Sequence, residues 1–307
     1  MAFETLTVYL GSSGHARDIF QNSATEMGTL IGQNNKRLVY GGMDAGLMGR
    51  VALAALDSGA HVTGIIPRKL KDSERILTNL SETVMVEDLW DRKKRMFKLA
   101  DAVITLPGGY GTMDEALEVL YWANLGLHNI PLVLVNIDGY WNDMIAYIKT
   151  LPDYDACFLI VVNAVKDVIP ALEAFTQPPA PTEQTDRFPH FEDEIARDTK
   201  EPIVIDIPSI ENTYYAICAL GLKQLHKHKR AIGFLNQDGE FDHLLAWINT
   251  AAKEHFITEN CLKLFAVGNE ENTLRKELKS QTYIEIDLHE AKWGKAQDEP
   301  LKEVKIN

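Results

Sequence analysis

The chain has 307 residues, 46% of them hydrophobic and 24% charged, which are the proportions of a globular protein with room for one large domain or two smaller ones. Its formal net charge of −13 argues against a general electrostatic grip on DNA or RNA, and its three widely spaced cysteines indicate neither a disulfide framework nor a CxxC metal or redox motif. The apolar runs are far shorter than the roughly 20 residues that span a bilayer, and the N-terminus lacks the features of a secretory signal, so we expect a cytoplasmic protein without a membrane or nucleic-acid partner.

From residue 5 to about residue 175, apolar runs of strand length alternate with stretches whose apolar residues recur at helical spacing. The expected strands span 5–10, 37–40, 61–66, 83–87, 101–106, 131–136 and 158–162. The expected helices span 46–57, 89–99, 112–126 and 140–150. This alternation predicts an α/β fold built on a doubly wound, Rossmann-like parallel sheet.

Residues 176–202 break this pattern, because five prolines stand there among polar and acidic residues. Strand-like sequence resumes at residue 203. We therefore predict a nucleotide-binding catalytic domain at 1–177, a linker at 178–202, and a smaller α/β domain at 203–307.

The smaller domain resembles a degenerate partial copy of the later half of the first. In the register that we expect, 102–107 aligns with 203–208, and 136–139 aligns with 236–239 after a one-residue gap. The residues that then replace Gly108, Gly109, Gly111 and Glu115 are Ser209, Ile210, Asn212 and Ala216. Their side chains would crowd a phosphate and no carboxylate remains, so we expect no catalytic site in the copy.

Two glycine-rich loops each run from an expected strand into an expected helix. The first extends from Gly41 to Gly49 and includes Gly42 and Gly46. Its glycines let the backbone approach a ligand, and the N–H groups and dipole of the next helix attract an anion. A tight strand-to-helix turn without a ligand would explain this loop equally well.

The second loop is the stronger signal, because three of four successive residues, Gly108 to Gly111, are glycine. Such a loop places several amide donors around a phosphate-sized space. The spacing of Thr112 and Glu115 also fits a capping box, which is the purely structural alternative for the glutamate. Because ligands in such folds bind at strand ends, two loops of this kind favour a binding site.

Between the two loops lies a basic helical stretch, 88–96. A run of basic residues is usually a solvated face. Helical spacing nevertheless allows Arg92 to point inward while Lys94 points to water, and an inward arginine can bind phosphate in bidentate fashion.

These segments together resemble the LONELY GUY family of cytokinin-activating phosphoribohydrolases, whose members often carry the name lysine decarboxylase. The family motif PGGxGTxxE is matched in full from Pro107 to Glu115, and its GGGxxGLMG loop is matched from Gly41 to Gly49 except at Met43. The resemblance covers roughly residues 5–175. The chain departs from the family at Leu10, where a cysteine is usual, and at 89–93, which keeps the arginine and lysine of the usual Met-His-Glu-Arg-Lys but loses its histidine.

The resemblance implies hydrolysis of the bond between base and ribose in a nucleoside 5′-monophosphate such as AMP, which gives free base and ribose 5-phosphate. Glu115 would orient or deprotonate water or stabilise positive charge on the sugar, and Arg92 would anchor the substrate or help the base to leave. The residues expected to bind substrate or phosphate are Ser12, Gly41, Gly42, Gly46, Arg92, Lys93, Gly108, Gly109, Gly111 and Thr112. A homodimer or higher homo-oligomer is also implied, with no metal and no organic cofactor.

A non-catalytic nucleotide or cofactor binder of the same fold is the alternative. It would need the glycine loops but not the carboxylate, so the presence of both Glu115 and Arg92 favours an enzyme. The acidic charge disfavours a DNA-processing relative. The sequence leaves the base open between adenine, an N6-substituted adenine and other purines or pyrimidines.

Overall fold

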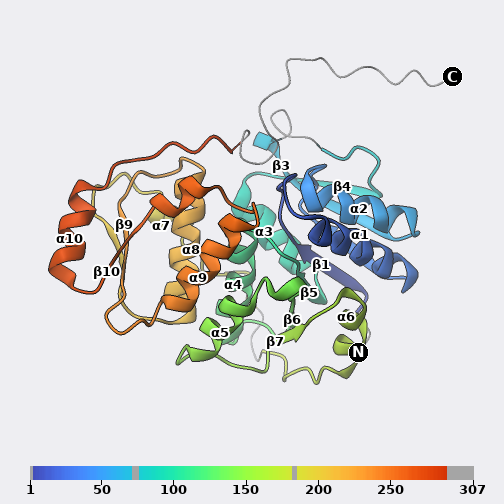
Figure 1. Ribbon diagram of the computed structural model, residues 1–307. Coiled ribbons are helices and arrows are strands. Elements are labelled where there is room, and N and C mark those ends of the chain that lie inside the picture. The colour runs from blue at the N-terminus through green and yellow to red at the C-terminus, as the bar shows by residue number, and fades with distance from the viewer. Residues whose placement is uncertain (1–2, 71–75, 182–184, 289–307) are drawn as a thin grey trace, which may run out of the picture.

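The computed structural model describes residues 3–70, 76–181 and 185–288, and no helix in these ranges is long and apolar enough to cross a membrane. Its larger unit is built on a seven-stranded parallel sheet of order β4-β3-β2-β1-β5-β6-β7 (Figure 1). The strands are β1 (Thr5–Tyr9), β2 (Arg37–Tyr40), β3 (His61–Pro67), β4 (Glu82–Val86), β5 (Ala102–Thr105), β6 (Leu132–Val135) and β7 (Leu159–Val162). All seven match expected strands to within one residue at each end, which confirms the predicted fold class.

The central strands β5 and β6 consist of residues that are all buried. Successive side chains of a strand point to opposite faces, so both faces of the sheet are covered by helices. These helices are α1 (Asp18–Gln33), α2 (Gly46–Asp57), α3 (Leu89–Lys98), α4 (Tyr110–Asn124), α5 (Asn142–Thr150) and α6 (Val168–Ala174). Single 3₁₀ turns occur at η1 (Arg68–Leu70), η2 (Ile137–Gly139) and η3 (Val165–Asp167).

The long helix α1 is absent from the expected elements. Its buried stripe contains Phe20, Ala24 and Met27, which is ordinary helical spacing, but glycines at positions 28 and 32 weaken the local helix signal. In the structure these glycines are the contact with α2. A Cβ added to Gly28 would lie 2.2 Å from the carbonyl oxygen of Val51, so close packing requires the residue that makes the helix hard to predict.

The smaller unit has a three-stranded parallel sheet of order β10-β9-β8. Its elements are β8 (Ile203–Ile205), α8 (Ile210–Gln224), β9 (Ile232–Leu235), α9 (Asp242–Lys253), η4 (Glu259–Lys263), β10 (Ala266–Gly268) and α10 (Glu271–Ser280). Figure 1 shows α8 and α9 between this sheet and the larger unit, where α8 packs on α4 and α9 packs on α5.

The smaller unit repeats the hydrogen bonds of the larger one. The Nε2 of His128 bonds to the carbonyl of Val119, and the Nε2 of His228 bonds to that of Ala219, both at 2.8 Å. The strand pairs Val103–Leu132 and Ile203–Ile232 also correspond. From β5 to α5 each residue thus matches the one 100 positions later, so the expected alignment was wrong by one residue around the second glycine loop. The counterpart of Glu115 is Tyr215 rather than Ala216, which again is not a carboxylate.

Part of the expected linker packs on the larger unit. The short helix α7 (Glu192–Ile195) lies in this segment, the His190 ring stacks on Trp90 at 4.0 Å, and the Trp122 indole donates to the Pro189 carbonyl at 2.8 Å. The segment is therefore part of the packed structure. The division into domains at 177 and 203 stays a prediction.

Candidate active site

A cavity of about 230 Å³ lies beyond the carboxyl ends of β1, β2 and β5. This is the edge at which open α/β sheets bind ligands. Its lining from the larger unit comes from the loop after β1, the loop after β2, helix α3 and the start of α4. These residues are Leu10, Gly11, Ser12, Gly41, Met43, Met48, Leu89, Arg92, Lys93, Gly109, Tyr110, Gly111, Thr112, Asp114 and Glu115.

The N-terminus of α4 is open at this edge, whereas at the start of α2 the Leu47 amide already donates to the Gly11 carbonyl at 3.2 Å. The residues before the two helices, Ala45 and Gly109, have extended backbones, and no side chain caps either helix in the described residues. The first amides of a helix lack intrahelical partners and carry partial positive charge. Such an end beside a cavity suits an anion, and phosphate binding at the two glycine loops stays a prediction.

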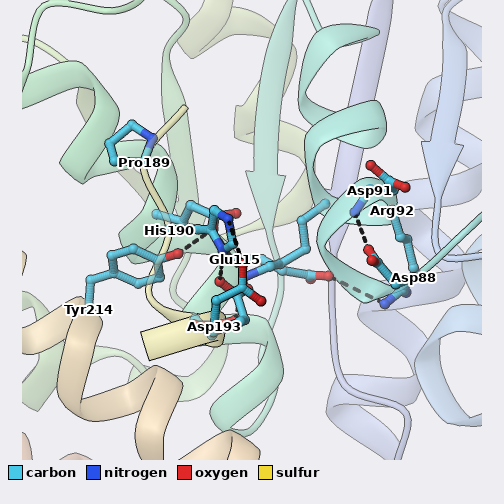
Figure 2. Close-up of polar contacts among 12 residues, drawn as sticks. Asp88, Asp91, Arg92, Glu115, Pro189, His190, Asp193 and Tyr214 are labelled. Atoms are coloured by element: carbon cyan, nitrogen blue, oxygen red, sulfur yellow. Dashed lines mark hydrogen bonds and ion pairs between the residues drawn. The ribbon is translucent and has the colours of Figure 1, made fainter. Parts of the chain in front are cut away.

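Arg92 reaches the cavity through a space that Gly41 leaves free. A Cβ on Gly41 would lie 1.7 Å from Nη2 of Arg92. The Arg92 Nη1 stands 3.6 Å from Oε1 of Glu115, and its buried Nε has no hydrogen-bond partner in the described residues. Figure 2 shows Arg92 and Glu115 reaching toward one another, with Tyr214 on the other side of Glu115. The inward orientation expected of Arg92 is confirmed.

Glu115 does not belong to a capping box. Helix α4 already begins at Tyr110, so Thr112 and Glu115 both lie inside the helix. The glutamate is 9% exposed, and burial raises its pKa to about 7, against the opposing effect of the Arg92 charge. A carboxyl group with this pKa can hold or release a proton at neutral pH, which suits acid–base catalysis.

Two glycines of the second loop leave space for neighbouring atoms, and the third faces the cavity. A Cβ on Gly108 would lie 2.1 Å from Oγ1 of Thr112, and a Cβ on Gly109 would lie 2.7 Å from the Phe256 carbonyl oxygen. Gly111 has no neighbour within 4 Å at that position, so it faces open space in the cavity wall.

In the first loop, Gly46 has a φ of +50°, and a Cβ there would lie 2.4 Å from the Ser13 carbonyl oxygen, which holds the loop against Ser12. Gly42 has a φ of +77° and contacts Ile66, so it shapes the turn without lining the cavity. Gly108 is likewise absent from the lining. Phosphate binding by all these residues stays a prediction.

Lys93 lines the cavity at the centre of a buried charge cluster. Its ammonium lies 3.0 Å from both Asp114 and Glu118 and pairs with Glu192 of α7. Although burial opposes ionisation, these carboxylates raise the pKa of Lys93. Burial raises the pKa of Glu118 to about 8, whereas the hydrogen bond from His190 and the Lys93 charge outweigh burial and lower the pKa of Glu192 to about 2. One firm ion pair, Lys93 with Glu192, therefore dominates the cluster. Whether Lys93 also contacts phosphate stays a prediction.

Asp114, Glu192 and Cys218 offer three possible metal-ligand atoms within 4.8 Å of one another. The Lys93 ammonium already bonds to both carboxylates, and it would repel a cation placed there. Burial also raises the pKa of the Cys218 thiol well above its usual value, which disfavours the thiolate that a metal needs. This arrangement favours an internal ion pair over a metal centre.

The sequence analysis did not find the cavity residues that come from beyond the larger unit. These are Glu192, Cys218, Gly221, Leu222, Gln224, Leu225 and Phe256. No motif marks them, because they reach the cavity only through the packing of α7, α8 and the loop after α9. Asp114 and Glu118 were also missed, although Asp114 occupies a variable position inside the PGGxGTxxE motif and Glu118 stands three residues after it on α4.

Fold and cavity together define a Rossmann-like α/β protein with a buried arginine–glutamate pair beside the open N-terminus of α4. A model of the family described as possible lysine decarboxylase matches residues 48–172 and 216–278, one stretch in each unit. The chain belongs to this family, whose members include the LOG proteins, and the resemblance found in the glycine motifs is confirmed.

Two relatives are plant proteins named cytokinin riboside 5′-monophosphate phosphoribohydrolase. LOG5 of Arabidopsis thaliana is 39% identical over 180 residues, which cover 56% of this chain and 78% of the relative. LOG3 of the same plant is 44% identical over 146 residues, or 48% of this chain and 68% of the relative. Among solved structures, the molybdenum cofactor binding protein of Rippkaea orientalis is 20% identical with a TM-score of 0.46, covering 57% of this chain and 98% of its own.

Proposed function

We propose that the chain hydrolyses the N-glycosidic bond of a nucleoside 5′-monophosphate and releases the free base and ribose 5-phosphate. The observation that carries the proposal is the buried pair of Arg92 and Glu115, 3.6 Å apart, beside the open N-terminus of α4. The names of the plant relatives support the same reaction and favour it over a non-catalytic binder.

The phosphate binds at the glycine loops, where amides of α4 from Gly111 and Thr112 and the loop at Gly41 face the cavity. Charge-assisted bonds from amides and an arginine are among the stronger polar contacts, and they fix the position of the ribose C1′. AMP therefore binds more tightly than adenosine, which lacks the charged group.

Glu115 acts on the sugar. With its pKa raised to about 7 by burial, the ionised carboxylate accepts a proton from the attacking water or stabilises the positive charge that develops at C1′. Arg92 neutralises the carboxylate in the resting site and contacts the phosphate or the departing base. The new bond joins water oxygen to C1′, and the C1′–N bond electrons leave with the base.

The experiment is incubation of the protein with a panel of nucleoside monophosphates, followed by chromatography for free base and ribose 5-phosphate. Glu115→Gln keeps the shape of the side chain but cannot accept a proton, so turnover falls by at least about 100-fold while AMP binding by calorimetry persists. Release of base from no member of the panel would leave a nucleotide-binding protein without this activity. An oligomer of several chains, which the resemblance implies, stays a prediction testable by sedimentation.

A further inference from the structure

The two units contact each other reciprocally. Trp141 stacks on Trp247 at 5.8 Å, and the counterpart pair, Phe241 with Tyr147, lies at 6.2 Å. Asp143 meets its own counterpart, His243, at 3.4 Å. Each contact between the two copies thus recurs with the roles of the copies exchanged. Such reciprocal contacts are the mark of a local twofold axis that relates the copies.

The reciprocity extends to the helices beside the cavity. Tyr214 donates a hydrogen bond to Glu118, and in the counterpart pair Cys218 and Asp114 bring their side-chain sulfur and oxygen within 4.8 Å of one another. Both pairs join α4 to α8, so α8 stands beside α4 as a second copy of α4 would stand across a symmetric interface. Helix α8 then continues past the N-terminus of α4 and into the cavity wall.

That wall has the character of a base-binding surface. The α8 residues that line the cavity are Cys218, Gly221, Leu222, Gln224 and Leu225, and none is a cation. They belong to the last turns of a helix that ends at Gln224, where the dipole is negative and repels phosphate. Across the cavity stand the apolar side chains of Met43, Met48 and Leu89.

Gly221 makes space in this wall. Its counterpart on α4 is Tyr121, a large side chain, whereas a Cβ on Gly221 would meet only the Tyr110 Cβ, at 3.8 Å. An alanine therefore fits in ordinary contact. A tyrosine at this position would extend into the cavity that Gly221 lines.

We propose that the second repeat is a built-in partner subunit whose helix α8 forms the base-specificity wall of the site, with Gly221 as the residue that sets the size of the base accepted. The assignment of this wall to the base rests on the proposed function. It makes a residue of the degenerate copy, outside the glycine motifs, the determinant of substrate choice.

The test compares Gly221→Tyr with Gly221→Ala and with Lys227→Tyr, which adds the same ring at an exposed position outside the cavity. For each protein, calorimetry measures binding of AMP, an N6-alkylated AMP and ribose 5-phosphate, and chromatography measures base release. Replacement of helical glycine favours the helix, so Gly221→Tyr folds, which its thermal melting checks.

We expect Gly221→Tyr to weaken AMP binding and raise KM by about tenfold or more, because overfilling a packed site excludes the ligand, and to weaken the N6-alkylated nucleotide further. Ribose 5-phosphate binding stays within about twofold, and the control Lys227→Tyr stays within about threefold of the original protein, while Gly221→Ala, which adds a smaller group, loses less nucleotide affinity than Gly221→Tyr. Equal losses for ribose 5-phosphate and AMP, or no loss for either nucleotide, would overturn the proposal. Nucleotide binding without base release by the unmodified protein would refute the hydrolase function alone, and failure to bind any nucleotide would refute both.

Discussion

Gly41→Ala should disable the site without unfolding the protein. The added Cβ would lie 1.7 Å from Arg92 Nη2 and 2.8 Å from its Cζ, whereas real contacts stay above 3.0 Å, so the guanidinium must withdraw by more than about 1 Å. The displaced atoms form the end of a flexible side chain, so the free energy of unfolding changes by less than about 1 kcal/mol. A misplacement of this size can cost on the order of 100-fold in rate, or about 2.7 kcal/mol of transition-state stabilisation.

The assay is kcat/KM from base release, with urea unfolding measured on the same samples. Gly221→Ala is the matched control, because it adds a methyl group to the same cavity with its nearest neighbour 3.8 Å away. The double variant Gly41→Ala/Arg92→Ala completes a double-mutant cycle. If Gly41 acts through Arg92, Gly41→Ala causes no further loss of activity once Arg92 has been replaced. Additive losses, or full activity in Gly41→Ala, would refute the reasoning.

Three other predictions follow from the cavity and its surroundings. Because burial raises the pKa of Glu115 to about 7, kcat should rise with pH as this group ionises, and a flat profile between pH 5 and 9 would exclude it as the base. Burial raises the pKa of Glu118 from 4.5 to about 8, so the protonated group stabilises the fold fully below pH 4.5, and this stabilisation is lost as the pH rises through 8. The thermal stability of Glu118→Gln should therefore not show this loss. The same pH dependence in both proteins would contradict the pKa shift. Asp153→Ala should lower the free energy of unfolding by about 1 kcal/mol by removing the acceptor for the Ile210 amide, yet leave base release unchanged, as denaturant titration and chromatography would check.

The strands of the larger sheet could be predicted because most are short apolar runs between polar stretches, as in β6, where all four residues are buried. Helix α1 could not be predicted, because Gly28 and Gly32 lower its local helix propensity. These glycines stabilise the structure through close packing of α1 on α2, which is a long-range contact that local sequence does not reveal. The register of the repeat was shifted by one residue for a related reason. Local identities favoured one alignment, while the strand pairing of Ile203 with Ile232 fixes another.

For the site, the sequence indicated the residues that follow strands directly. Gly41, Gly109 and Glu115 reach the same cavity because the carboxyl ends of β1, β2 and β5 share one edge of the sheet. Glu192 and the α8 wall could not be found this way. Their position depends on how the second repeat packs on α4 and α5, and neither spacing nor periodicity within the segment carries that information.

The same packing is consistent with the prediction that only the first copy carries a catalytic site. At the N-terminus of α4 the loop after α9 brings Phe256 close to Gly109 and leaves a cavity. At the N-terminus of α8 the corresponding loop after α5 brings Asp153, whose two carboxylate oxygens accept from the Ile210 amide at 2.9 and 3.0 Å. A carboxylate of the chain itself thus accepts the amide hydrogen bond at the start of α8 that a bound phosphate would otherwise accept. Because this carboxylate belongs to the folded chain, no entropy is lost in immobilising a separate ligand. With that helix end already satisfied, α8 has no need of a glycine loop for phosphate, and its last turns line the cavity beside α4 instead.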